Sequence, residues 1–114
     1  MSRHRQHRLV EILKRTAAEY IRDVSSSESL ITITDALLSK DGKVITLLIN
    51  VIPEDKEYSA LVFMNRKRHE LFKHLKQHSN LAFIPKIIFE VNEGEKRRRR
   101  IDELIARDKG VQKS

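Results

Sequence analysis

The stretch that decides the fold runs from Leu61 to Phe89 and reads LVFMNRKRHELFKHLKQHSNLAFIPKIIF. Its first part has the apolar spacing of a helix, but a run of polar residues, 65–70, interrupts that pattern before it resumes and ends near Asn80. A β-branched and aromatic run entered through Pro85 follows, which is typical of a strand. We therefore expect a helix interrupted by a basic segment and then a strand, an arrangement that presents positive charge at a helix junction.

The rest of the chain supplies the other helices and strands. Residues 5–24 carry apolar side chains at three- and four-residue spacing, which predicts an amphipathic helix. Residues 30–38 and 44–51 predict two strands joined by a turn at 39–43, where Asp-Gly is the strongest turn signal. The pattern places the interrupted helix at 57–79, the third strand at 81–91 and a mostly polar last helix at 95–108.

This order, α-β-β-α-α-β-α, predicts an α+β domain. Two strands joined by a short turn pair antiparallel, whereas the second and third strands, joined by a helical crossing, can lie parallel. The strand at 44–51 is apolar on both faces, so it lies centrally or is covered on both sides. We expect a three-stranded mixed sheet with helices packed on one face. At 114 residues the chain is most simply one domain, 1–114, with a core at about 5–91, a C-terminal basic helix at 92–108 and a flexible tail at 109–114.

Charge narrows the class of partner. The formal net charge is +7, and 34% of the residues are charged. Because the positive charge is clustered, it favours nucleic acid over a role in solubility alone. A membrane surface is the weaker candidate, since there is no Trp for the apolar face of a membrane-lying helix. No apolar run approaches the ~18 residues of a membrane span, and the basic N-terminus is not a secretory signal. The absence of cysteine fits a cytoplasmic protein.

Three groups of cations are candidate nucleic-acid contacts. The first lies at the helix interruption, where backbone N–H groups of a junction would add to the attraction for phosphate. The second is a run of five cations, which repel one another when unpaired and so commonly form an interaction segment. The third is at the N-terminus. The candidate residues are Arg66, Lys67, Arg68, Lys73 and Lys76 at the interruption, Lys96, Arg97, Arg98, Arg99 and Arg100 in the run, and Arg8 in the first helix.

Each group also has a purely structural explanation. The cations at the interruption can form a solvated helix face, and the run of five can be partly neutralised by Glu93, Glu95, Asp102 and Glu103. The aromatic residues fall mostly on apolar faces, which predicts core positions rather than a platform for stacking bases. We therefore expect recognition of nucleic-acid backbone and shape.

Patterns for catalysis and metal binding are nearly absent. There is no Gly-rich phosphate loop, GxSxG, HExxH or Cys nucleophile, and the chain has only three glycines. His74 and His78 are four residues apart and share a helical face, but no third ligand is obvious, so solvated histidines are the better interpretation. The sequence predicts no enzymatic activity, no metal and no cofactor.

Four segments, taken in order and spacing, resemble a known family. They are similar to its opening Arg-x-x-x-x-Ile pattern, its first strand and Ser-x-Asp turn, its Leu-Arg-x-x-Pro-x-Leu-x-Phe segment and its closing Arg-Ile-x-x-Leu-Leu. The matching residues are Arg8–Leu13, Thr32–Ala36 with Ser39–Asp41, Leu81–Phe89 and Arg100–Ile105. Residues 8–105 thus resemble ribosome-binding factor A, a family of bacterial small-subunit assembly factors. The resemblance implies a KH-like (type II) fold.

The resemblance also implies a function. It predicts a monomer that binds the small (30S) ribosomal subunit and its 16S rRNA and assists late maturation and processing of the rRNA 5′ end without catalysis. The alternative is a protein–protein adaptor that docks through Ile101, Leu104 and Ile105 of the last helix. A small hydrolase or nuclease would need a carboxylate cluster that the sequence does not provide.

Two departures from the family pattern bear on the site. Where the family has an Ala-x-Gly kink, this chain has Lys67-Arg68-His69, and Ala82 stands where the family often has Arg. A kink without glycine must be made by ordinary residues, or the helix runs straighter. Our hypothesis is that Lys67 and Arg68 supply by charge what the missing glycine supplies by close backbone approach.

Overall fold

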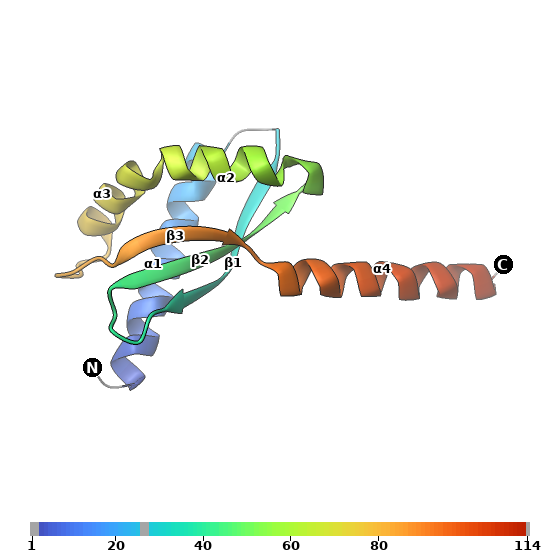
Figure 1. Ribbon diagram of the computed structural model, residues 1–114, viewed down its shortest axis with the longest axis horizontal. Coiled ribbons are helices and arrows are strands. Elements are labelled where there is room, and N and C mark those ends of the chain that lie inside the picture. The colour runs from blue at the N-terminus through green and yellow to red at the C-terminus, as the bar shows by residue number, and fades with distance from the viewer. Residues whose placement is uncertain (1–2, 26–27, 114) are drawn as a thin grey trace.

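The computed structural model has the element order that the sequence predicts (Figure 1). The structure describes residues 3–25 and 28–113. Within them the elements are α1 Arg3–Val24, β1 Leu30–Leu38, β2 Val44–Ile52, the 3-10 helix η1 Glu54–Lys56, α2 Glu57–Arg66, α3 Arg68–His78, β3 Lys86–Val91 and α4 Glu93–Lys113. The predicted order of helices and strands and the interruption between the two middle helices are confirmed.

The sheet has β2 at its centre, between β1 and β3. β2 pairs antiparallel with β1 and parallel with β3, which confirms the α+β class and the mixed sheet. The turn between β1 and β2 is closed by side chains: the hydroxyl of Ser39 donates to Asp41 (2.7 Å) and accepts from the N–H of Val44 (3.0 Å). The first two predicted strands are therefore a hairpin.

The core lies between the sheet and α1, α2 and α3, which cover one face (Figure 1). Along β2 every second side chain is buried on that face, while the residues between them are only half-buried. β2 is thus central with one covered face, the first of the two arrangements that its apolar sequence allows. The fully buried residues include Ile45, Leu47, Ile49 and Val51 of β2, Leu13 and Ile21 of α1, Met64 of α2, and Leu71 and Leu75 of α3.

β3 is shorter than the strand predicted at 81–91, because it begins at Lys86. Asn80 ends α3 in the left-handed conformation (φ 58°), which asparagine tolerates better than most residues. Pro85 has no N–H to donate to a neighbouring strand, and the N–H of Lys86 makes the first bond to the sheet (2.9 Å). Residues 81–85 therefore run outside the sheet.

Two aromatic side chains lie on the surface, although the sequence predicts mostly core positions for this residue type. Tyr20 and Phe89 are buried, but Phe83 is 60% exposed and Tyr58 is 80% exposed. Phe83 is exposed because its segment, residues 81–85, runs outside the sheet before β3 begins. Tyr58 is exposed because it lies on the outer side of α2.

Asn92 anchors α4 to the sheet. Its N–H donates to the carbonyl of Ile49 (2.8 Å), and its side-chain N–H donates to Thr34 Oγ1 (2.8 Å) at the bulge of β1. Its side-chain oxygen accepts the N–H of Glu95 (3.0 Å), which caps the helix. From this anchor α4 projects away from the sheet (Figure 1).

α4 is also longer than the helix predicted at 92–108, since it runs to Lys113. It includes most of the segment 109–114, for which the sequence predicts a flexible tail, and that flexibility stays a prediction. Within residues 3–25 and 28–113, no helix combines the length and the apolar character needed to cross a membrane.

Candidate nucleic-acid interface

The bend between α2 and α3 is made by a single residue, Lys67. Its backbone (φ −89°, ψ −1°) lies in the bridge region, which an L-residue can occupy without the freedom of glycine. Its N–H donates to the carbonyls of both Phe63 and Met64 (3.1 Å each). The bend therefore forms without glycine, and this backbone N–H is already used inside the protein.

The bend gathers cations around one cavity of about 380 Å³. Arg66 comes from the end of α2, Arg68 from the start of α3 and Lys86 from the start of β3. Arg68 is held in place because its guanidinium donates to the side-chain oxygen of Asn65. The residues lining the cavity are Asn65, Arg66, Arg68, His69, Phe72, Lys86 and Ile87, none of which is acidic.

Lys67 faces away from this cavity. Its ammonium lies 3.4 Å from Glu70 Oε2 and 5.9 Å from the centre of the Phe63 ring. Glu70 also accepts a hydrogen bond from the hydroxyl of Tyr20 in α1 (2.9 Å). These contacts tie the bend to α1, so Lys67 has a structural role as well as a charge.

The contact between Tyr20 and Glu70 shifts the pKa of both side chains. Burial, and then the neighbouring carboxylate, raise the pKa of Tyr20 to about 12. The hydrogen bond from Tyr20, followed by the charge of Lys67, lowers the pKa of the Glu70 carboxyl. Glu70 is therefore ionised at neutral pH and holds both α1 and Lys67.

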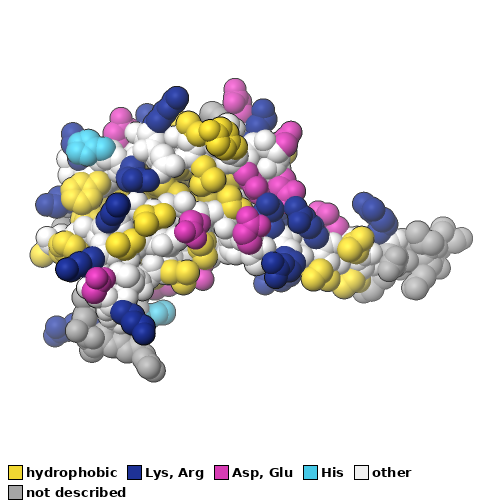
Figure 2. All heavy atoms as spheres, in the orientation of Figure 1, with side chains coloured by type: hydrophobic (Ala, Val, Ile, Leu, Met, Phe, Trp, Pro, Cys, Tyr) yellow, Lys and Arg dark blue, Asp and Glu magenta, His cyan; other side chains and the backbone are white. Residues whose placement is uncertain are grey.

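Lys73 and Lys76 extend the basic surface along α3. Both are exposed, and the ammonium of Lys76 lies 5.7 Å from the centre of the ring of Phe72, which lines the cavity at the bend. In Figure 2 cationic side chains gather around the α2–α3 junction and again at the base of α4, with acidic side chains between them. The cations predicted at the interruption thus lie together on α2 and α3.

The run of five cations in α4 is largely paired with carboxylates. The ammonium of Lys96, whose side chain is only 11% exposed, lies 3.0 Å from Glu57, 3.7 Å from Glu93 and 3.8 Å from Glu54. The hydrogen bond to Glu57 raises the pKa of Lys96 above its ordinary value. Lys96 therefore fastens α4 to η1 and α2.

Two arginines of the run are also paired. Arg98 makes an ion pair with Glu95, and Arg100 with Glu54 (3.2 Å). Of the partners foreseen from the sequence, Glu93 and Glu95 are used. Glu54 and Glu57 come from a distant part of the chain, and no sequence signal linked them to α4.

Arg97 and Arg99 are the two cations of the run that form no ion pair within the described part of the chain. Arg97 is exposed and Arg99 is half-buried. The surface next to the base of α4 is acidic, because Glu57, Glu90 and Glu93 line one shallow cavity there. An anionic strand that runs from the bend to α4 across this face would meet repulsion.

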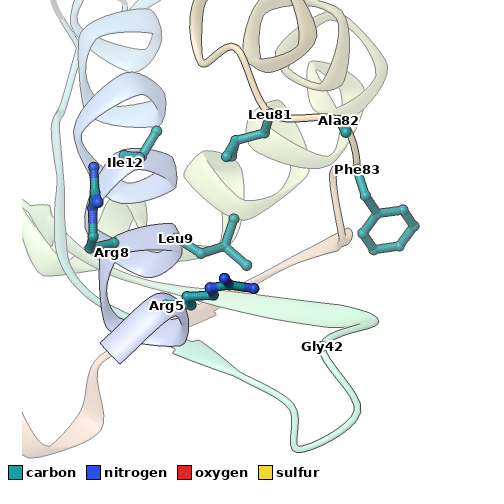
Figure 3. A pocket seen from close by; sticks show the side chains of 8 residues that line it. All are labelled: Arg5, Arg8, Leu9, Ile12, Gly42, Leu81, Ala82 and Phe83. Atoms are coloured by element: carbon teal, nitrogen blue, oxygen red, sulfur yellow. The ribbon is translucent and has the colours of Figure 1, made fainter. Parts of the chain in front are cut away.

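The remaining predicted residue, Arg8, lies on α1 at a different cavity, which it shares with Arg5 (Figure 3). The three predicted groups of cations therefore occupy three separate places. Lys86 is the site residue that the sequence analysis missed. The signal was present, since a lysine directly after Pro85 begins the strand, but its position beside the bend depends on the parallel pairing of β2 and β3.

The histidine pair makes a packing contact. The rings of His74 and His78 stack with centroids 4.1 Å apart, and His78 Nδ1 lies 2.9 Å from the carbonyl oxygen of His74. Burial, and then the charge of His78, lower the pKa of His74. Among the residues that the structure describes, no three His, Cys, Asp or Glu side chains are grouped to hold a metal ion.

Comparison with known proteins places this geometry in a family. The family model of ribosome-binding factor A matches residues 5–105. The ribosome-binding factor A of Methylobacterium nodulans is 27% identical over 110 residues, which cover 92% of this chain and 82% of the relative. A Methylobacterium sp. protein of the same name is also 27% identical and covers 92% of this chain and 79% of its own.

Solved structures agree with this fold. The crystal structure of ribosome-binding factor A from Thermus thermophilus is 28% identical, with a TM-score of 0.67 over 75% of this chain and 92% of that chain. A homology model of the Thermus thermophilus factor, fitted into the cryo-EM map of its complex with the 30S subunit, is 27% identical, with a TM-score of 0.65 over 73% of this chain and 90% of that chain. A Thermotoga maritima protein, at 18% identity and a TM-score of 0.61 over 74% of this chain and 83% of that chain, shares the fold. The mixed sheet, the bent helix pair and these matches agree with a KH-like domain, and the chain belongs to the ribosome-binding factor A family.

Proposed function

We propose that this protein binds the small ribosomal subunit through its 16S rRNA and assists late maturation of that RNA, including processing of its 5′ end. It makes and breaks no bond itself. The proposal is supported by its family and by the related factor that was fitted into a 30S complex. We further propose that it acts as a monomer in the cytoplasm.

The observation that carries the proposal is the cavity at the bend. Arg66, Arg68 and Lys86 surround it, and no lining residue is acidic. Arginine presents a planar set of donors that suits phosphate oxygens, and lysine adds a point charge. Contacts to the RNA backbone position a protein on its target without reading sequence. We assign the main RNA contact to this cavity, with additional positive charge from Lys73 and Lys76 further along α3 and from Lys67 on the other side of the bend.

The other predicted cations have secondary roles in this proposal. Arg97 and Arg99, and Arg8 on α1, are placed to contact RNA outside the bend. Lys96, Arg98 and Arg100 already have carboxylate partners, so each would have to give up an ion pair to bind phosphate. We expect their contribution to RNA affinity to be small.

The decisive experiment deletes the gene, separates ribosomal particles on a sucrose gradient and quantifies unprocessed 16S rRNA. We expect free small subunits to accumulate with precursor RNA. A plasmid with the wild-type gene should restore mature RNA, and one with Arg66→Ala, Lys67→Ala and Arg68→Ala together should not. Normal subunit ratios and mature RNA in the deletion strain would refute the assembly role.

A second candidate function is a protein–protein adaptor. Ile101, Leu104 and Ile105 are 51%, 58% and 49% exposed on α4, and their spacing places them on one side of the helix. A partner that docks there would bind through apolar contacts. Binding that persists in high salt and after ribonuclease treatment, and that is lost on Leu104→Glu, would favour the adaptor over the RNA-binding function.

A further inference from the structure

A second cavity, of about 390 Å³, opens between the start of α1 and the segment that precedes β3 (Figure 3). Its interior is apolar: Leu9 and Ile12 come from α1, and Leu81 comes from the opposite wall. Ala82, also on that wall, contributes only a small side chain. No acidic residue lines the cavity.

Cations and an exposed aromatic ring lie around this cavity. Arg5 extends across its lower edge, and Arg8, about one turn further along α1, extends along the side of the helix that is turned away from Phe83 (Figure 3). The ring of Phe83 stands at the other side, 60% exposed. An apolar hollow with a flat ring at its edge and two arginines of α1 beside it suits a ligand that has a flat, weakly polar face and a negative charge close by.

A nucleotide in a single strand has both features. Bases stack on aromatic side chains in proteins that bind single-stranded RNA, and cationic side chains hold the phosphates beside them. A base within a duplex is already stacked on its neighbours and does not present its face. The chemistry at this cavity therefore selects an unpaired nucleotide.

We propose that this cavity binds one unpaired RNA base, which stacks on Phe83 while the positive charge of Arg5 and Arg8 on α1 attracts the phosphates of the same strand. This inference rests on the proposed function, since it takes the ligand to be part of the bound RNA. The apolar residues of the lining offer no side-chain hydrogen bonds to the edge of the base, so the contact tolerates any base. It differs from the sequence-based expectation that the aromatic residues lie mostly in the core and that recognition depends on RNA backbone and shape, because Phe83 is exposed.

The test uses the full-length chain and a short single-stranded RNA that carries the fluorescent base 2-aminopurine, whose emission falls when it stacks on an aromatic ring. Wild-type protein should quench it. Phe83→Tyr should keep the quenching, and Phe83→Leu, which retains apolar area but no ring, should abolish it. Because loss of one stacking contact weakens binding on the order of 10- to 100-fold, Kd should rise by that factor for Phe83→Leu and Phe83→Ala.

The exposure of Phe83 makes these variants informative. A side chain on the surface contributes little to folding, so melting temperatures should stay close to wild type. Equal RNA affinity and equal quenching in wild type and Phe83→Leu would overturn the proposal. So would a photoreactive residue at position 83 that crosslinks to a ribosomal protein and not to RNA in small subunits.

The outcome separates this inference from the proposed function. If wild type and the Phe83 variants bind RNA and sediment with small subunits alike, the base pocket is wrong and the assembly role stands. If the wild-type chain does not sediment with small subunits at all, the assembly role fails. In that case, quenching of the free RNA probe by the protein would not be sufficient to support the pocket as part of that role.

Discussion

The bend between α2 and α3 and the basic run of α4 look alike in sequence and differ in structure. In the sequence both are dense in Lys and Arg, and the run of α4 is the denser of the two. In the structure Arg66 and Arg68 line an open cavity without a carboxylate, whereas Lys96, Arg98 and Arg100 form ion pairs. The number of cations in a segment thus does not measure the charge that it offers to a partner. The carboxylates that fold back onto the segment decide that.

The two regions lie at opposite ends of α2, and their charges have different roles there. With a rise of about 1.5 Å per residue, the ten residues of α2 separate its ends by roughly 15 Å. At one end Lys96 draws Glu54 and Glu57 together and fixes the start of α4. At the other end the bend presents arginines to solvent. Charge fastens the fold at the first end and is available for binding at the second.

The largest effect expected from this difference is on subunit binding. Arg66→Ala with Arg68→Ala should weaken binding to small subunits on the order of 10- to 100-fold. It should also reduce the slope of log affinity against log salt concentration by the amount expected for the loss of about two phosphate contacts. Co-sedimentation across a range of salt concentrations measures both quantities.

The matched control is Arg98→Ala with Arg100→Ala, which removes the same amount of charge from α4. Because both arginines are paired with Glu95 and Glu54, we expect affinity and salt dependence near those of wild type. If the two double variants lose affinity equally, the distinction between bend and run is lost.

The second prediction tests the anchor of α4. Asn92→Ala should lower the free energy of unfolding by about 1–2 kcal/mol, since it removes the cap on Glu95 and the bond to Thr34. Asn92→Asp keeps the capping oxygen and should lose less. Chemical denaturation measures both. Subunit binding should be unchanged at low temperature, and a large loss there would assign the RNA contact to α4.

The third prediction concerns the support beneath the bend. Tyr20→Phe removes the hydroxyl that binds Glu70 and should cost about 1 kcal/mol at neutral pH. Since folding raises the pKa of Tyr20 from 10.0 to about 12, this stabilisation is complete below about pH 10 and is lost as the pH rises toward 12. The stability difference between wild type and variant, followed by thermal melting from neutral to alkaline pH, should shrink across that range. A constant difference would show that the hydroxyl acts through packing alone.

The smallest effect is expected from restoring a glycine near the bend. His69→Gly should cost up to about 1 kcal/mol, because it places glycine in the first turn of α3. It should leave subunit binding close to wild type, since Lys67 makes the bend with an ordinary backbone conformation. A marked gain in affinity would mean that close backbone approach, rather than charge, limits the contact.

Local sequence patterns were sufficient for the elements and their order. The alternation of residues 30–38, the Asp-Gly turn and the break after Met64 each act through near neighbours, and each prediction is confirmed. The start of β3 was predicted wrongly because the apolar spacing of residues 81–85 looks like a strand. The left-handed Asn80 and the missing N–H of Pro85 take those residues off the sheet.

The site was harder to predict because it depends on contacts between distant segments. Lys86 lies at the bend because β3 pairs with β2 and packs against α2. Glu54 and Glu57 neutralise α4 only because α4 leaves the sheet beside η1. Neither contact produces a regular residue spacing that could be recognised in the sequence.

The projection of α4 gives the molecule an unusual reach. Its 21 residues span about 30 Å, and the whole protein measures 58 Å in its longest direction and 18 Å in its shortest. A molecule of that shape, with α4 anchored at Asn92, can contact two distant places on one large particle at the same time. Once the compact end is docked, the tip of the helix searches only a small volume, so even a weak contact there gains from a high effective concentration. Shortening the helix from its C-terminus would remove that advantage and leave the first contact unchanged.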